Sequence, residues 1–197
     1  MSSAPLLIES LDFSDLYGLH SQDDWAAAED VLSDAAQRLE QAGAQALMIC
    51  ANSMHRVYDN VQERVDIPII HIADSVGQRM KDSGANNAAL IGTRNVMTEN
   101  FYRQRLVAHG VDLLPPDMAV VEQLDTIIYD QLMVGKVKRD AERALKTIIT
   151  RKGQEGAKAI VLACTELELI VDVGANVLPI FDSAGIHCEA AADWILG

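Results

Sequence analysis

The sequence has 197 residues, of which 49% are hydrophobic, and a formal net charge of −13. This composition indicates a globular chain of one domain or two small ones rather than a disordered one. The negative charge argues against nucleic acid and anionic membranes as partners, because both need basic patches. A small carboxylate remains possible, since a local cluster of hydrogen-bond donors can bind one.

The cysteines and the apolar runs indicate a reduced, cytoplasmic protein. Cys50, Cys164 and Cys188 show neither a disulfide nor a zinc spacing. We find no signal-peptide pattern and no apolar run that approaches the ~20 residues needed to cross a bilayer.

The predicted elements alternate between strands and helices, which favours an α/β fold with mainly parallel sheets. In chain order the sequence predicts a strand at 5–10, a helix at 25–42 that begins with a capping box of Ser21 and Asp24, a strand at 47–50, a helix at 53–64, a strand at 68–72, a helix at 74–83, a strand at 88–92, a helix at 97–109, a strand at 111–114, helices at 120–133 and 136–151, strands at 160–162 and 177–181, and a closing helix at 182–196.

One segment of the sequence occurs twice. Residues 156–166 (GAKAIVLACTE) match residues 43–53 (GAQALMICANS) at an offset of 113 positions, with a shared Gly, two shared Ala and an apolar run. A repeat of this length suits two similar half-domains. Gly43 and Gly156 are each expected to end a helix in the left-handed conformation.

Both copies of the repeat end in small polar residues, Asn52–Ser53 and Thr165–Glu166. In open α/β sheets, ligands bind at the carboxyl ends of the strands. Two such ends that face each other across a cleft would place Ala51 opposite Cys164.

A cysteine at this position suits proton-transfer chemistry. A thiolate is a modest base, with a free pKa of about 8.5 that a polar site can lower. Two thiols on opposite faces of an amino acid could invert its stereocentre, while Asn or Thr side chains hold the α-carboxylate. We expect no cofactor and no metal, because the sequence shows no phosphate loop, no Gly-x-Gly-x-x-Gly and no cluster of His and carboxylates at ligand spacing.

Five segments together resemble the aspartate/glutamate racemase family, close to its broad-specificity amino-acid racemase branch. They are CANSMH at 50–55, GTR at 92–94, NFYR at 100–103, ACTEL at 163–167 and LPIFDS at 178–183. The resemblance covers essentially the whole chain and implies a cofactor-independent, homodimeric racemase. It also implies two pseudo-symmetric, three-layer α/β domains, here 1–85 plus 183–197 and 86–182, with the active site in the cleft between them.

The same resemblance assigns roles to individual residues. It makes Cys164 one catalytic acid or base, with Thr165–Glu166 beside it. Asn52–Ser53 match the family's Asn-Thr pair that binds the carboxylate of the substrate, and Thr93 lies at a Gly-Thr turn that lines the same cleft.

The chain departs from the family pattern at two places. The family has Cys, or in some members Thr, where this chain has Ala51, and a methyl group neither accepts nor donates a proton. The family also opens with a strand and a Gly-Gly-Met-Ser-Trp-like loop that contacts substrate, and we expect this sequence to start after that loop. We therefore expect weak turnover or none.

Three functions remain compatible with these residues. The first is an amino-acid racemase of the aspartate/glutamate type with one base replaced. The second is a one-base decarboxylase or lyase, which needs only Cys164. The third is a non-catalytic member that binds carboxylates, in which Asn52, Ser53 and Thr93 could also serve as helix caps.

The other cysteines and the histidines are expected to be structural. Cys50 should point away from the site, because side chains alternate along a strand, and both Cys50 and Cys188 are expected in the core. We expect backbone partners for His55 and His187, and no constellation among His20, His71 and His109.

Overall fold

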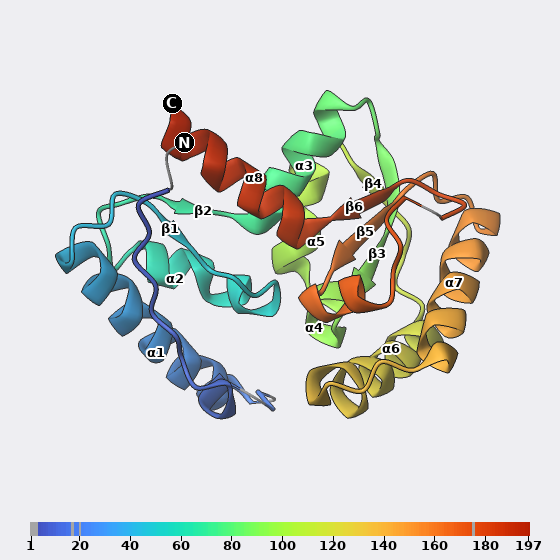
Figure 1. Cartoon of the computed structure of the whole chain (residues 1–197), viewed down its shortest axis with the longest axis horizontal. Helices are drawn as coiled ribbons and strands as arrows, with labels where there is room; N and C mark the ends of the chain where they lie inside the picture. Colours follow the sequence, from blue (N-terminus) through green and yellow to red (C-terminus); the bar gives the residue numbers. More distant parts are fainter. Residues whose placement is uncertain (1–3, 17, 20, 175) are drawn as a thin grey trace.

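Two parallel sheets form the centre of the structure. The computed structural model describes residues 4–16, 18–19, 21–174 and 176–197 (Figure 1). One sheet has two strands and the other has four, in the order β4-β3-β5-β6, and every pair of neighbours is parallel. The strands are β1 (Leu47–Met48), β2 (Ile69–Ile70), β3 (Asn87–Gly92), β4 (Asp112–Leu113), β5 (Ile160–Ala163) and β6 (Ile180–Asp182). The predicted α/β fold with parallel sheets is confirmed.

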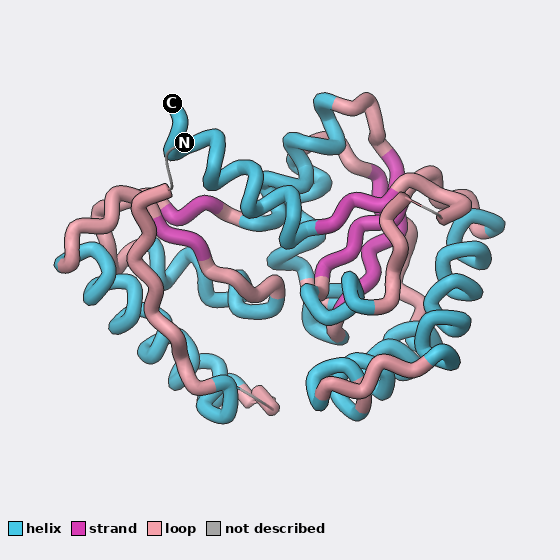
Figure 2. The backbone as a smooth tube through the Cα atoms, in the orientation of Figure 1, coloured by secondary structure: helices cyan, strands magenta, loops and turns pink. Residues whose placement is uncertain are grey.

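Helices surround both sheets (Figure 2). The α-helices are α1 (Gln22–Gln41), α2 (Tyr58–Gln62), α3 (Ile72–Asp82), α4 (Arg94–Thr98), α5 (Asn100–Ala108), α6 (Met118–Asp130), α7 (Arg139–Gln154) and α8 (Ser183–Leu196). Short 3-10 helices are η1 (Phe13–Leu16), η2 (Ser53–Val57), η3 (Leu132–Val134) and η4 (Thr165–Leu169). In the part of the chain that the structure describes, no helix is both long and apolar enough to span a membrane.

The four-stranded sheet is covered on both faces. Ile160 and Leu162 of β5 pack in the cluster that contains α6 and α7. Val161 and Ala163 lie in the opposite cluster, together with side chains of α3, α5 and α8. Successive residues of a strand point to opposite faces, so a continuous apolar run is what a strand buried on both sides requires.

The two glycines of the repeat end their helices as expected. Gly43 has φ +97 and Gly156 has φ +106, conformations that side chains disfavour. The predicted capping box is also present, because the Ser21 hydroxyl accepts from the Asp24 N–H and the Asp24 carboxylate accepts from the Ser21 N–H. These local signals correctly place the helix ends.

The strand predicted at 5–10 is wrong. These residues are extended without strand pairing, and Ile8 is 84% exposed. Within the described residues, β1 pairs with β2 and with no other strand. An apolar segment becomes a strand when a neighbouring backbone offers hydrogen bonds, and here the segment is instead held by an ion pair between Glu9 and Arg38 of α1.

Two further elements differ from their predicted bounds. The helix predicted at 97–109 is divided into α4 and α5 at Glu99, whose ψ of 164 is extended. The strand predicted at 177–181 is β6, which begins at Ile180 because its pairing with β5 starts there. In both cases the backbone geometry follows tertiary contacts that helical or apolar patterning does not encode.

Candidate functional site

Thr93 and Cys164 follow directly on two adjacent strands of the four-stranded sheet. The last residues of these strands, Gly92 and Ala163, are partners in the β3–β5 pair. A Cβ added at Gly92 would lie 2.6 Å from the Ala163 carbonyl oxygen, so glycine is required for the two strands to approach this closely. The segments that begin with Thr93 and Cys164 therefore leave the sheet side by side at its carboxyl edge, where ligands of α/β sheets bind.

The thiol of Cys164 is buried and forms a hydrogen bond with a carboxylate. Cys164 is 4% exposed, and its Sγ donates to Glu166 Oε2 across 3.1 Å. The Thr165 hydroxyl donates to the same oxygen across 2.9 Å and so fixes its position. Burial, followed by the negative charge of Glu166, raises the pKa of Cys164 well above its ordinary value. The resting group is thus a thiol whose proton faces a carboxylate that can accept it.

Asn52 links the two-stranded sheet to the four-stranded one. Its Nδ2 donates to the Ser183 hydroxyl across 3.0 Å, over a sequence separation of 131 residues. Asn52 is 5% exposed, and its Oδ1 has no hydrogen-bond partner among the described residues. The interpretation of Asn52 as a helix cap is wrong, because its side chain makes no capping hydrogen bond to η2.

Thr93 is a second buried polar residue with an unused hydroxyl. It precedes α4 without capping it, and its Oγ1 lacks a partner within the described part of the chain. Buried polar atoms in proteins are normally hydrogen-bonded. Thr93 Oγ1 can therefore donate or accept a further hydrogen bond, whereas Asn52 Oδ1 can only accept one.

A cavity of about 370 Å³ has Thr93 in its lining, whereas Cys164, Glu166 and Asn52 do not line it. It has the size of a small-molecule site. Its lining consists of Phe13, Leu16, Gly18, Leu19, Trp25, Ser53, Met54, Thr93, Arg94, Asn95, Asp125, Thr126, Tyr129, Asp130 and Met133.

The predicted site residues divide into three groups. The structure places Ser53 and Thr93 in the lining of the cavity, and it joins Cys164 to Thr165–Glu166 by hydrogen bonds. Asn52 contacts Ser183 and does not line the cavity. Ala51 is half-buried and packs against the apolar cluster of α1, β1 and β2. Its position opposite Cys164 stays a prediction.

Glu168 and Asp182 form a carboxyl pair that no pattern in the sequence predicted. Asp182 ends β6 and accepts hydrogen bonds from the N–H groups of Ala184 and Gly185. Glu168 lies in η4 within hydrogen-bonding reach of Asp182, and burial, Asp182 and Glu166 together raise its pKa to about 8. The sequence contains one hint of this pair, the Glu-x-Glu pattern at 166–168 directly after Cys164. The approach of Asp182 to Glu168 arises only in the folded chain.

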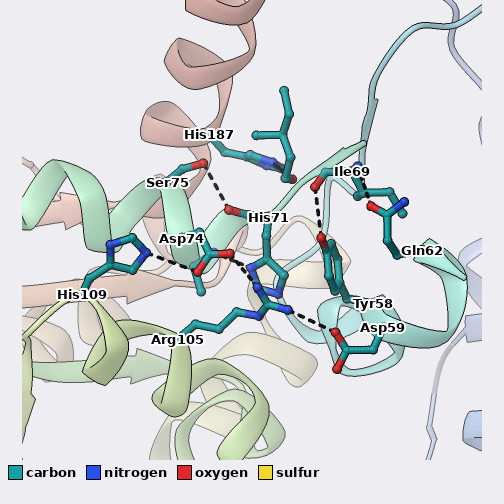
Figure 3. Close-up of polar contacts among 12 residues, drawn as sticks. Tyr58, Asp59, Gln62, Ile69, His71, Asp74, Ser75, Arg105, His109 and His187 are labelled. Carbon is teal, nitrogen blue, oxygen red and sulfur yellow. Dashed lines mark hydrogen bonds and ion pairs between the residues drawn. The ribbon is translucent and has the colours of Figure 1, made fainter. Parts of the chain in front are cut away.

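The histidines form a second cluster, which lies where α3 and α8 meet β2 (Figure 3). His55 and His187 bond to the carbonyl oxygens of Ile49 and Ile70, so the expected backbone partners are confirmed. His71 Nδ1 accepts from the Ala73 N–H and caps α3.

One of the remaining histidines, His109, takes part in an ion-pair network that the sequence does not indicate. Asp74 binds Arg105 across 2.6 Å and His109 across 3.4 Å, and the guanidinium of Arg105 lies 4.5 Å from the centre of the Tyr58 ring. Figure 3 shows His71 beside this network. His20 lies outside the described residues. The residues come from α2, α3 and α5, and no sequence spacing connects them.

The expectation that Cys50 and Cys188 lie in the core is also wrong. Both are exposed, and neither forms a disulfide. Cys50 follows β1, which belongs to the two-stranded sheet. Although Cys50 is exposed as a residue, partial burial of its thiol raises the pKa of Cys50, and the nearby Cys188 adds to the shift.

Known proteins share both the sequence and the fold. A family described as Asp/Glu/Hydantoin racemase matches residues 3–191. The chain is 24% identical over 165 residues to the broad specificity amino-acid racemase RacX of Bacillus subtilis. The aligned region covers 83% of this chain and 70% of that protein.

Two crystal structures are similar over nearly the full chain. A Yersinia pestis structure assigned to the Asp/Glu racemases has a TM-score of 0.90 and 35% identity, covering 100% of this chain and 86% of that one. An aspartate racemase homologue from Pyrococcus horikoshii has a TM-score of 0.82 and 31% identity, covering 97% and 83%. With its strand-end thiol and its parallel sheets, the chain belongs to the Asp/Glu/hydantoin racemase family.

Proposed function

We propose that the protein is a cofactor-independent amino-acid racemase that moves the α-proton of a small amino acid, of the aspartate or glutamate type, with Cys164 as one proton-transfer group. The observation that carries this proposal is the hydrogen bond of the Cys164 thiol to Glu166, at the strand end beside Thr93. Family membership supports the same reaction class.

The side chains suggest how the first step proceeds. Glu166 accepts the proton of Cys164, and the resulting thiolate removes the α-proton of the substrate. Negative charge then develops on the substrate's α-carboxylate as the carbanion forms. The Thr93 hydroxyl would donate to that carboxylate, and so would the Asn52 Nδ2 hydrogen that does not bond to Ser183. Such donors act most strongly in a site that excludes water. Burial, followed by the negative charge of Glu166, disfavours the thiolate form of Cys164 in the free protein.

Deuterium exchange at Cα tests the role of Cys164. The protein is incubated in deuterium oxide with L- or D-aspartate and L- or D-glutamate, and the α-proton signal is followed by NMR. Because the Bacillus subtilis relative is named as broad in specificity, other amino acids belong in the panel. Cys164→Ala should lower exchange of at least one enantiomer by about 10²–10⁴-fold, the usual contribution of a general base.

Cys50→Ala and Cys188→Ala are matched controls, because both thiols are exposed. Each should exchange at the unsubstituted rate. If the unsubstituted protein exchanges no amino acid of the panel, the racemase proposal fails. Equal loss in all three variants would also contradict a specific role for Cys164.

A one-base decarboxylase or lyase is the second candidate. Ala51 favours this candidate because its methyl group cannot act as a second acid or base. A decarboxylase or lyase protonates one face of its intermediate, which Cys164 alone could do. Substituted malonates and β-substituted acids separate the two activities, since this enzyme would release product without racemisation. A non-catalytic carboxylate-binding protein would instead gain thermal stability with ligand and show no exchange.

The wider setting of the activity is also proposed. We place the substrate between the domains 1–85 plus 183–197 and 86–182, and the enzyme in the cytoplasm, in keeping with its free cysteines. The family resemblance favours a homodimer. Small amino acids or dicarboxylates are the expected ligands, with no nucleic acid or membrane partner.

A further inference from the structure

We propose that Arg94 binds the side-chain carboxylate of the substrate and so selects dicarboxylic amino acids over neutral ones, with Asp125 as the residue that positions it. This inference rests on the proposed racemase function, to which it adds the residue that determines the substrate side chain. It assigns the cavity that Thr93 lines to that side chain.

Thr93 sets the direction in which a substrate would lie. It leaves the sheet beside Cys164, because Gly92 and Ala163 are partners in the β3–β5 pair. It also lines the cavity, and its buried Oγ1 has no hydrogen-bond partner among the described residues. A substrate whose α-carboxylate accepts from this hydroxyl would have its Cα at the strand ends and its side chain in the cavity.

Arg94 is the one basic side chain in the lining of this cavity, within the part of the chain that the structure describes. It is the first residue of α4 and directly follows Thr93. Its side chain is 43% exposed, so a ligand can reach the guanidinium. Because an arginine side chain extends farther than that of threonine, Arg94 can contact a second carboxylate of a molecule whose first carboxylate lies at Thr93.

Asp125 of α6 holds Arg94 by two hydrogen bonds. The backbone N–H of Arg94 donates to Asp125 Oδ1 across 3.2 Å, and its Nε donates to Oδ2 across 2.8 Å. The same carboxylate thus fixes the start of α4 and one edge of the guanidinium. The two terminal nitrogens of Arg94 form no hydrogen bond with any described residue. Their N–H groups are free to bind a carboxylate, the anion that the planar guanidinium matches in shape.

The N-terminal part of the chain supplies the apolar side of the cavity. Figure 1 shows the start of α1 opposite α6 at the lower edge of the molecule. The apolar lining residues from this part are Phe13, Leu16, Leu19, Trp25 and Met54. They can contact the methylene groups of a substrate side chain. They also exclude water, which strengthens a charge-assisted hydrogen bond.

The other charged groups around the cavity leave Arg94 as the cation for a ligand. Arg56 is paired with Glu99 across 2.8 Å and is not part of the lining. Asp130 lines the cavity but is exposed at the end of α6, so salt and water screen its repulsion of a bound carboxylate. Asp125 offsets part of the charge of Arg94, so recognition depends on the geometry of the free N–H groups.

The substitution Arg94→Gln tests the assignment. It removes the guanidinium but keeps the backbone N–H that bonds to Asp125. The rate of α-exchange for aspartate relative to asparagine should fall by about 10–100-fold, the effect of losing a hydrogen bond to a charged group. Asparagine has nearly the same shape as aspartate and no side-chain charge. A purely structural defect would slow both substrates equally and leave the ratio unchanged.

Arg79→Gln is the matched control. Arg79 is also an ion-paired arginine, its side chain is 44% exposed, and it lies outside the lining of the cavity. This variant should keep the ratio of the unsubstituted protein.

Asp125→Asn tests the positioning role. It keeps an acceptor for the backbone N–H of Arg94 but loses the carboxylate oxygen that holds Nε. The KM for aspartate should rise by about 3–10-fold, the effect of one hydrogen bond, while kcat and the KM for asparagine stay the same. An equal change for both substrates would contradict a positioning role.

Ligand-induced thermal stabilisation gives a measurement that does not depend on turnover. At equal concentrations, L-aspartate should raise the Tm of the unsubstituted protein more than L-asparagine does, and Arg94→Gln should remove this difference. If Arg94→Gln is unstable, the unsubstituted protein alone decides, because equal stabilisation by both ligands would overturn the assignment.

The outcomes separate the two proposals. If the unsubstituted protein exchanges the α-proton and Arg94→Gln keeps the aspartate-to-asparagine ratio, Arg94 does not select the side chain and the racemase proposal stands. If no amino acid of the panel exchanges but aspartate stabilises the protein in a manner that depends on Arg94, the racemase proposal fails and the carboxylate-binding role of Arg94 holds. A preference for asparagine in either assay would overturn the assignment of Arg94.

Discussion

Asn52 and Thr93 both precede a short helix, the position where Asn and Thr most often accept hydrogen bonds from the first turn. Neither does so here. Asn52 donates instead to Ser183, and Thr93 lies in the lining of the cavity. Asn52 Oδ1 and Thr93 Oγ1 have no hydrogen-bond partner among the described residues. A protein tolerates unused buried polar atoms at a cost of about 1–3 kcal/mol each, which a ligand can offset by binding them.

Ala51 is the residue whose replacement should most directly change the reaction. Ala51→Cys adds a thiol beside Asn52, at the position where the family resemblance leads us to expect Cys or Thr. We expect the rate of inversion relative to α-exchange to rise, by up to the ~10²–10⁴-fold that a positioned acid or base contributes. Chiral chromatography of the product, together with NMR of the α-proton, measures both rates.

The result would be informative in either direction. Ala51→Ser, which adds a polar group of similar size without an effective acid, is the control and should leave the ratio unchanged. An Ala51→Cys protein that folds normally and still inverts no faster would show that position 51 does not face the substrate.

At the scale of elements, the approach of α7 to β5 sets where Cys164 emerges. Gly156 reverses the chain between them at φ +106, and its N–H bonds to the Gly153 carbonyl oxygen across 3.1 Å. The strand that follows is buried throughout. The turn therefore determines where β5, and so the thiol, lies in the sheet.

Two glycines close to each other at the end of α7 should respond to substitution in opposite ways. Gly156→Ala places a Cβ on a left-handed residue and should lower the free energy of unfolding by about 1–2 kcal/mol. Gly153→Ala lies inside the helix, where its Cβ would meet a flexible Leu178 methyl at 3.4 Å. It should be neutral or stabilising by up to about 1 kcal/mol, since alanine favours helices.

Urea denaturation followed by circular dichroism compares the two variants. The same loss of stability in both would mean that crowding, rather than backbone conformation, governs this turn. A stable Gly156→Ala protein would contradict the left-handed conformation itself.

At the scale of the whole molecule, three histidines hold the two-stranded sheet against α3 and α8. The rings of His55 and His71 have centroids 4.3 Å apart, and those of His55 and His187 are 5.8 Å apart. Burial lowers the pKa of all three, that of His55 to about 3, and their mutual repulsion when charged adds to the shift for His55 and His71. The junction is therefore stable only while these rings are neutral.

Acid should weaken the protein from about pH 6.5 downward. The unfolded chain binds protons at its histidines near pH 6.5, whereas the folded chain resists doing so until the lowered pKa of each ring, about 3 for His55. The contribution of the neutral histidines to stability is thus complete above pH 6.5 and falls below it, by about 1.4 kcal/mol per pH unit for each such proton. Glu168 opposes this trend, because its raised pKa contributes stability at low pH that is lost as pH rises from 4.5 to about 8. Because three histidine rings lose stability as pH falls and only one carboxyl gains it, we expect the protein to be less stable at low pH.

Denaturation midpoints between pH 8 and pH 5 check this expectation. His71→Asn keeps an acceptor for the N–H of Ala73 and cannot titrate, so it should flatten the pH dependence. His109→Asn, which replaces a partly exposed ring, is the control. Stability that is unchanged from pH 7 to pH 5 would contradict a neutral histidine junction.

Patterns within short windows correctly predicted much of the fold. The repeat at 43–53 and 156–166 indicated two strands with polar exits, and its glycines indicated two helix ends, because both signals depend on residues next to each other in the chain. The strand expected at 5–10 and the single helix expected at 97–109 failed for the opposite reason. Pairing partners and the break at Glu99 depend on what packs nearby.

The sequence by itself determined the family resemblance, the parallel α/β architecture and the thiol at the end of β5. Tertiary structure decided which groups surround that thiol. Asn52 meets Ser183 across 131 residues, and Glu168 meets Asp182 from a neighbouring strand end. Local conformational preference is encoded by adjacent residues, whereas hydrogen bonds and shifted pKa values arise from distances through space, which only the folded chain establishes.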